Sequence, residues 1–150
     1  MKIYLLLAED PFYTLPLVKS IVEDTEHYII GATFPSGFIN IKRIQSTLLI
    51  YGAFRFIKTV FFVLYWKVIN GGRVAHYLQS KGIDIKYEKN INSSNYIEYI
   101  NELDIDLLIS NNSPQKLKKK LLSTPRRGAI NLHLGMLPSY RGVFPIFHAL

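Results

Sequence analysis

Apolar and polar residues alternate along this chain with two different periods. Five apolar runs have the length and composition of buried strands, and they cover residues 2–8, 28–34, 83–88, 106–110 and 129–134. Between these runs, apolar residues recur at helical spacing over residues 15–23, 73–80, 95–102 and 114–122. This order of strands and helices predicts an α/β fold, in which helices cover both faces of a doubly wound, mostly parallel sheet.

Two of the expected helices have recognisable start signals. Ser94 and Ser113 stand at the start of helical segments, and a serine oxygen there can accept a hydrogen bond from a first-turn N–H. Pro114 follows Ser113, and proline is favoured at the first position of a helix. We therefore expect both serines to be N-caps.

Residues 41–70 depart from this pattern because they are rich in aromatic residues. A membrane-spanning helix needs about 20 largely uncharged residues, and Arg55 and Lys58 interrupt this stretch near its middle. A membrane span is therefore not predicted. Two interpretations stay open: helices that pack on the protein core, or an aromatic and basic surface that contacts a lipid interface, bases or sugars.

The positive charge of the chain is concentrated in one central stretch. Between His27 and Ile83 there are seven Lys and Arg residues and no acidic residue, whereas the remaining segments carry eleven charges of each sign. The whole net charge of +7 therefore belongs to this stretch. It predicts either a surface for an anionic partner or a solvated basic face.

Length and composition indicate one domain. A chain of 150 residues with 49% hydrophobic residues can bury a single core of ordinary size. The absence of cysteine excludes disulfides and thiolate metal sites, as expected for a cytoplasmic protein. The apolar opening meets Glu9 and Asp10 before a signal peptide could be completed, so it is interpreted as a buried first strand.

The strongest chemical signal is the pair Asn131 and His133. Residues two apart in a strand share a face, so the carboxamide and the imidazole lie on the same side of the last expected strand. A carboxamide donor beside an imidazole suits a reaction in which negative charge grows on a carbonyl oxygen while a nucleophile loses a proton. This pair indicates acyl transfer.

The residues around this pair resemble the signature of the formyltetrahydrofolate-dependent formyltransferases. The pattern of that family is Asn-x-His, a small residue, Leu-Pro, an aromatic residue and Arg-Gly, and the corresponding residues here are Asn131, His133, Gly135, Leu137, Pro138, Tyr140, Arg141 and Gly142. Residues 106–117 resemble the family's fourth strand and the loop that walls the folate pocket, and residues 9–17 resemble its first strand-to-helix turn. Gly135 replaces the serine of many members, and Leu134 and Met136 depart from the commonest residues.

The resemblance implies a Rossmann-like sheet and a set of roles. Asn131 would donate to the oxyanion of a tetrahedral intermediate, and His133 would stabilise that intermediate and assist proton movement. The formyl donor would be 10-formyltetrahydrofolate. Residues implied to bind this cofactor are Ser113, Pro114, Gln115, Leu117, Gly135 and Leu137, and those implied to contact the acceptor are Tyr140 and Arg141.

The family's catalytic aspartate follows the histidine by a few dozen residues. Here no acidic residue follows Asp106, and loss of an orienting acid costs orders of magnitude in rate. We therefore expect residues 1–150 to form a partial catalytic domain with an insertion at about 41–70. Such a fragment would have a sheet incomplete at its C-terminal end and weak or no activity.

The acceptor stays open at this stage. An amine on a small molecule is favoured, such as an amino sugar linked to a nucleotide, with methionyl-tRNA second and a peripheral membrane contact through residues 41–70 as a further expectation. A non-catalytic protein that binds a membrane or polyanion is the rival interpretation. A dinucleotide-binding enzyme is not favoured, because residues 8–12 lack Gly-x-Gly-x-x-Gly. No histidine pair has the spacing of a metal site, so no metal is predicted.

Overall fold

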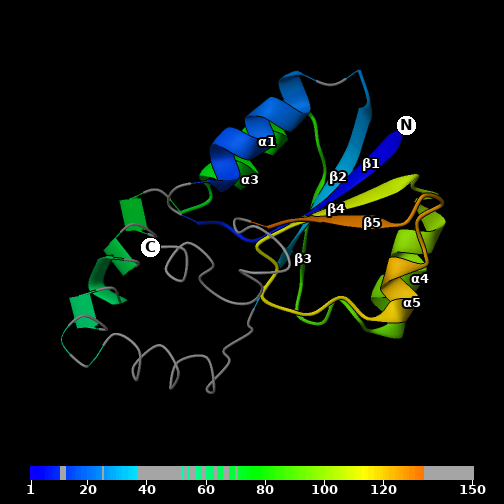
Figure 1. Cartoon of the computed structure of the whole chain (residues 1–150). Helices are drawn as coiled ribbons and strands as arrows, with labels where there is room; N and C mark the ends of the chain where they lie inside the picture. The colour runs from blue at the N-terminus through cyan, green and yellow to red at the C-terminus, as the bar shows by residue number, and fades with distance from the viewer. Residues whose placement is uncertain are drawn as a thin grey trace.

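A single parallel sheet forms the centre of the molecule. The computed structural model describes residues 1–10, 13–24, 26–36 and 71–133, together with scattered residues between 52 and 69. Five parallel strands are arranged in the order β3-β2-β1-β4-β5 (Figure 1). They are β1 (Lys2–Leu7), β2 (Tyr28–Pro35), β3 (Ile85–Glu88), β4 (Leu107–Asn111) and β5 (Ala129–Leu132). The five strands expected from the sequence are confirmed, with ends that differ by up to two residues.

Helices cover both faces of this sheet. On one face, α1 (Thr14–Glu23) and α3 (Arg73–Ser80) lie side by side, and on the other lie α4 (Ser94–Glu102) and α5 (Lys119–Leu122) (Figure 1). Apolar residues from alternate strand positions fill both interfaces. The first interface, here called the α1–α3 core, includes Leu5, Leu7 and Ile109. The second, the α4–α5 core, includes Leu6 and Leu108. The expected Rossmann-like, doubly wound α/β fold is thus confirmed.

The pairing of β1 with β2 depends on a glycine. The register of the two strands shifts between Ile3 and Tyr4. A Cβ atom on Gly31 would lie 2.7 Å from Cε2 of Tyr4, so only glycine leaves room for this ring. The Tyr4 hydroxyl reaches Thr33 Oγ1 at 2.8 Å, and burial raises the pKa of Tyr4 well above its ordinary range. The ring therefore anchors β1 to β2 as a neutral hydrogen-bonding group.

One expected helix is wrong over half of its length. The helix predicted for residues 114–122 begins only at Lys119, so Pro114 is not in a first turn. Ser113 is not an N-cap, because its hydroxyl bonds to the backbone of Gln115 instead. For the preceding helix the cap is Ser93 rather than Ser94, since Ser93 Oγ accepts from Tyr96 N at 3.3 Å. The physical reason for the late start of α5 is a set of tertiary hydrogen bonds described below.

The aromatic segment 41–70 lies largely outside the described residues. Those described between 52 and 69 are helical where a conformation is assigned, and most of their large apolar side chains are strongly exposed, including Phe54, Phe61 and Val68. In the described part of the chain, no helix combines the length and the apolar character that crossing a bilayer requires.

Candidate functional site

The strand order of the sheet reverses between β1 and β4. These two strands are neighbours although about a hundred residues separate them in the sequence. The chain first adds β2 and β3 on one side of β1, and then places β4 and β5 on the other side. In doubly wound sheets, ligands bind outside the carboxyl ends of the strands at this reversal. Glu9 and Asp10 follow β1 at the carboxyl edge of the sheet, Asn112 follows β4, and His133 follows β5.

Asn131 and His133 both lie at this edge of the sheet. Asn131 is an exposed residue of β5 and pairs with Ser110 of β4. Ala129, two residues earlier, packs against the α4–α5 core. Because strand residues two apart share a face, Asn131 lies on the α4–α5 side of the sheet. His133 comes directly after the end of β5 and is half-buried.

The segment that connects β4 to α5 lies on this same side and is firmly held. Gln115 is buried, and its Nε2 donates to the carbonyl of Lys89 at 2.7 Å while its Oε1 accepts from Ile91 N at 3.3 Å. In return, Asn92 Nδ2 donates to the carbonyl of Lys116 at 3.0 Å and its Oδ1 accepts from Lys118 N at 2.8 Å. Two side-chain amides thus join the loop at residues 112–118 to the turn at residues 89–92.

These tertiary bonds explain why the expected helix starts late. Asn112 has a left-handed backbone with φ of 55°, which leaves the strand direction abruptly. The Gln115 side chain and the backbone groups of Lys116 and Lys118 are bonded to the neighbouring turn. The resulting loop is held on the α4–α5 side of the sheet, the side on which Asn131 lies. Of the residues expected to bind a cofactor, Ser113, Pro114 and Leu117 are half-buried within this loop, whereas the amide of Gln115 is directed to the turn.

A second polar cluster lies on the opposite side of the same edge. Asn111, the last residue of β4, donates from Nδ2 to Thr14 Oγ1 at 3.2 Å. The Thr14 hydroxyl bonds to the carbonyl of Ala8 at 3.0 Å and to the carboxylate of Asp10. Asp10 also accepts from Tyr13 N at 2.6 Å. The ends of β1 and β4 are therefore joined to the start of α1 by buried polar groups.

The carboxylate of Glu9 joins the first strand to α3. It accepts from Gly72 N at 2.9 Å and from Val74 N at 3.2 Å. A carboxylate is favoured there, because the first N–H groups of a helix have no partner within it and the helix dipole is positive at that end. Glu9 thus compensates for Gly72, which stands at the N-cap and has no side chain to supply such a bond.

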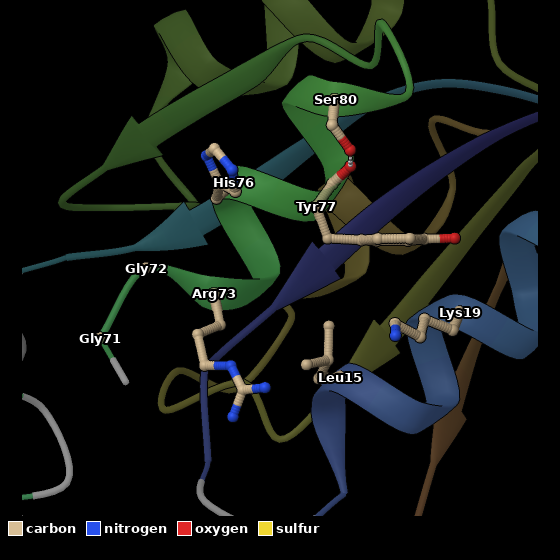
Figure 2. Close-up of a pocket in the computed structure, with 8 residues that line it drawn as sticks. All are labelled: Leu15, Lys19, Gly71, Gly72, Arg73, His76, Tyr77 and Ser80. Atoms are coloured by element: carbon tan, nitrogen blue, oxygen red, sulfur yellow. Dashed lines mark hydrogen bonds between the residues drawn. The ribbon is translucent and has the colours of Figure 1, made fainter. Parts of the chain in front are cut away.

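Beside this contact, a hollow of about 390 Å³ opens between α1 and α3. Figure 2 shows that Leu15 and Lys19 of α1 form one wall, and that α3 with its preceding glycine turn forms the other. The described residues that line it are Leu15, Lys19, Gly71, Gly72, Arg73, His76, Tyr77 and Ser80, with cations but no carboxylate among them. Because α1 and α3 cover the face opposite Asn131, this hollow does not contain the Asn-x-His pair.

The last acidic residue of the chain lies far from His133. Asp106 precedes β4 and accepts from Lys2 N at 2.8 Å, so it lies at the amino edge of the sheet. This backbone hydrogen bond holds the pKa of Asp106 below its ordinary value, helped by the Arg126 guanidinium. Asp106 therefore does not supply a carboxylate at the carboxyl edge.

The remaining expected site residues are Gly135, Leu137, Tyr140 and Arg141, and they lie outside the described residues. Within the described ranges, no three His, Cys, Asp or Glu side chains are grouped as metal ligands would be. Sequence reasoning did not single out Thr14, Ser110 or Asn111. Each of them is a polar residue at the end of a buried strand or the start of a helix. Such a position indicates a functional role only when the neighbouring strand is known.

Comparison with known proteins identifies a homologous segment. The chain is 38% identical over 69 residues to a methionyl-tRNA formyltransferase of Listeria innocua, a match that covers 46% of this chain and 22% of the relative. It is 36% identical over 76 residues to a methionyl-tRNA formyltransferase of Staphylococcus aureus, which covers 47% of this chain and 24% of the relative. No family model matches.

Part of the chain is therefore homologous to part of the methionyl-tRNA formyltransferases. The fold of the chain is also that of a solved structure, glycinamide ribonucleotide transformylase 1 from Geobacillus kaustophilus. The two align with a TM-score of 0.61 and 12% identity, over 99% of this chain and 65% of that protein. The matches to the curated formyltransferases span about a quarter of their length.

Proposed function

We propose that this protein transfers a formyl group from 10-formyltetrahydrofolate to an amine, and that Asn131 and His133 act on the reacting carbonyl. The observation that carries this proposal is the placement of the pair. Asn131 lies on the face of β5 that adjoins the loop at residues 112–118, and His133 comes directly after β5, at the edge of the sheet where this fold binds ligands. Partial homology to methionyl-tRNA formyltransferases supports the reaction class.

The roles of the two residues follow from their chemistry. The Asn131 Nδ2 group donates to the carbonyl oxygen on which negative charge grows, and removal of such a donor typically lowers the rate by about 10²- to 10³-fold. His133 comes two residues later, directly after β5, and moves the proton that the attacking amine releases. The reduced folate supplies the formyl group. The protein supplies the donor, the proton carrier and the exclusion of water.

The side chains beside Asn131 fit a folate-type ligand. Ser113, Pro114 and Leu117 form an ordered, half-buried wall, since Gln115 and Asn92 hold the loop backbone in place. A flat heterocycle with several donors and acceptors suits an apolar wall with a few fixed polar groups. Gly135 and Leu137 belong to this proposed pocket, and Tyr140 and Arg141 to the acceptor side.

For the acceptor we propose an amino sugar or a related small amine, including one linked to a nucleotide. The exposed aromatic side chains described between residues 52 and 69, such as Phe54 and Phe61, support a base or sugar on the acceptor. A methionyl-tRNA acceptor is the second candidate. It is supported by the names of the curated relatives and by the positive charge between residues 28 and 82.

The proposal is tested by calorimetric titration of the full-length protein with a stable formylfolate analogue, and by a formyl-transfer assay with amino sugars, nucleotide-linked amino sugars and methionyl-tRNA. We expect micromolar binding of the analogue and turnover with one of these acceptors. Asn131→Ala should lower turnover by about 10²- to 10³-fold. Asn101→Ala, which removes an exposed carboxamide on α4, should leave turnover unchanged. A protein that ignores reduced folates and instead binds anionic vesicles or RNA would be the non-catalytic binding protein considered above, and the proposal would be rejected.

A further inference from the structure

Ser110 is a buried hydroxyl whose presence packing does not explain. Its side chain is fully buried, and its Oγ has no hydrogen-bond partner among the described residues. Burial of a hydroxyl without a partner is unfavourable, because the group loses its bonds to water and gains none. If Ser110 served only to fill space, an alanine would serve better. An unpartnered polar group in a native core therefore needs a separate explanation.

The position of Ser110 supplies that explanation. Ser110 pairs directly with Asn131 across the β4–β5 ladder. Leu108 and Ala129, which precede these two residues by two positions, both pack in the α4–α5 core. Alternation along the strands therefore places the Ser110 hydroxyl and the Asn131 carboxamide on the same face. Neighbouring strands lie about 4.8 Å apart, a separation that a serine hydroxyl and a carboxamide can bridge.

A catalytic carboxamide needs a fixed orientation. Its oxygen only accepts hydrogen bonds and its nitrogen only donates, and the two ends have nearly the same shape. An asparagine that is free to rotate by 180° would present its oxygen to the reacting carbonyl for part of the time, and two like dipoles would then oppose each other. A hydroxyl beside the carboxamide removes this ambiguity, since its O–H can donate to Oδ1 and leave Nδ2 to face the ligand.

We propose that Ser110 is a positioning residue, whose Oγ–H donates to Asn131 Oδ1 in the ligand-bound site and directs Nδ2 toward the carbonyl oxygen of the formyl group. This inference rests on the proposed function for the identity of the ligand. The orientation of Asn131 by Ser110 can be measured without turnover.

The test uses three variants of the full-length protein. Ser110→Ala removes the hydroxyl, and Ser110→Thr keeps it. Thr33→Val removes an equally buried hydroxyl on β2 that is bonded to Tyr4, away from Asn131. We expect Ser110→Ala to lower kcat by about 10- to 100-fold, less than the loss of a direct donor. The KM for the formyl donor should change by less than about threefold, and Tm should stay the same or rise because no satisfied bond is lost.

Neither control variant should lower kcat as Ser110→Ala does. Ser110→Thr should keep kcat within about threefold of wild type, and Thr33→Val should lower Tm without lowering kcat, because it breaks a satisfied buried hydrogen bond. In an Asn131→Ala background, Ser110→Ala should have no further effect, since residues that act as a unit are not additive. Wild-type kcat in Ser110→Ala, or equal losses in Ser110→Ala and Ser110→Thr, would overturn the proposal.

A spectroscopic measurement separates this inference from the proposed function. The side-chain NH₂ pair of Asn131 can be assigned in a ¹H–¹⁵N spectrum by its loss in Asn131→Asp. With the formylfolate analogue present, Ser110→Ala should shift or broaden this pair and Ser110→Thr should retain it. If the wild-type protein shows no formyl transfer but the Asn131 signals respond in this way, the proposed function is wrong and the positioning role of Ser110 is supported. Identical Asn131 signals in all three proteins would reject the positioning role.

Discussion

Asn111 and Thr14 are joined by a hydrogen bond of 3.2 Å from Nδ2 to Oγ1, although 97 residues separate them in the sequence. Both side chains are buried. The bond connects the end of β4 to the start of α1, so it fixes two elements at the carboxyl edge of the sheet, where the strand order reverses.

Replacing Thr14 by valine should destabilise the fold. The change keeps the shape of the side chain but leaves the Asn111 amide and the Asp10 carboxylate without the Thr14 hydroxyl. An unsatisfied buried polar group costs about 1–3 kcal/mol, and urea unfolding would measure the loss. Ser20→Ala removes an exposed hydroxyl bonded to Asp24 and should cost less than about 0.5 kcal/mol. Equal stability of the two variants would contradict the role of Thr14.

The loop beside Asn131 should loosen when Gln115 is replaced by leucine. This substitution keeps an apolar stem but leaves the Lys89 carbonyl and the Ile91 amide without their partner, at a cost of about 1–3 kcal/mol. Amide hydrogen exchange should become faster at Ile91. Lys116→Leu changes a neighbouring exposed side chain and is the control. If exchange at Ile91 is the same in both variants, the loop is held by other contacts.

Gly31→Ala should destabilise the sheet through overpacking. The added Cβ would lie 2.7 Å from Cε2 of Tyr4, and such insertions typically cost about 1–3 kcal/mol. The same change in a Tyr4→Leu background should cost much less, because the ring that it strikes is gone. Denaturant unfolding of the wild type, the two single variants and the double variant would measure the coupling free energy between Gly31→Ala and Tyr4→Leu. If the two losses of stability simply add, the Tyr4 ring is not the cause of the destabilisation.

Stability should fall in acid partly through Asp106. The pKa of this carboxyl is lowered in the folded protein, chiefly by the hydrogen bond from Lys2 N. A group with a depressed folded pKa contributes stability above its unfolded pKa and loses that contribution as pH falls through the folded pKa. Asp106→Asn should therefore flatten the dependence of Tm on pH below about pH 4, the region of an ordinary aspartate. If Tm of Asp106→Asn falls with decreasing pH as steeply as Tm of the wild type, this assignment is contradicted. An NMR titration of the Asp106 carboxyl would locate its pKa directly.

Asn131→Asp should abolish formyl transfer without a comparable loss of stability. The carboxylate has the size of the carboxamide but no N–H to donate, and its charge opposes the charge that grows on the carbonyl oxygen. We expect kcat to fall by at least about 10²-fold with Tm within a few degrees, because Asn131 is exposed. Steady-state kinetics and thermal melting would measure the two effects. Turnover close to wild type would remove Asn131 from the proposed mechanism.

The alternation of strands and helices could be predicted because it is local. Each strand is a short apolar run, and α1, α3 and α4 show helical spacing with ends close to those observed. The same reasoning failed for residues 114–118, where Ser113 and Pro114 look like the start of a helix. There the side chains of Gln115 and Asn92 form hydrogen bonds with residues more than 20 positions away, and these bonds override the local preference for helix.

For the site, the sequence by itself predicted that Asn131 and His133 share one face of a strand, since a strand places residues two apart on the same side. The structure places Asn131 in β5 and His133 directly after its end. The sequence also determined the family that these residues resemble. Only the tertiary structure decided that Ser110 is the neighbour of Asn131, that Asn111 closes the edge against Thr14 and that Glu9 holds the start of α3. Those relationships depend on the order and register of strands far apart in the chain, and the period of an individual strand carries no information about which strand lies beside it.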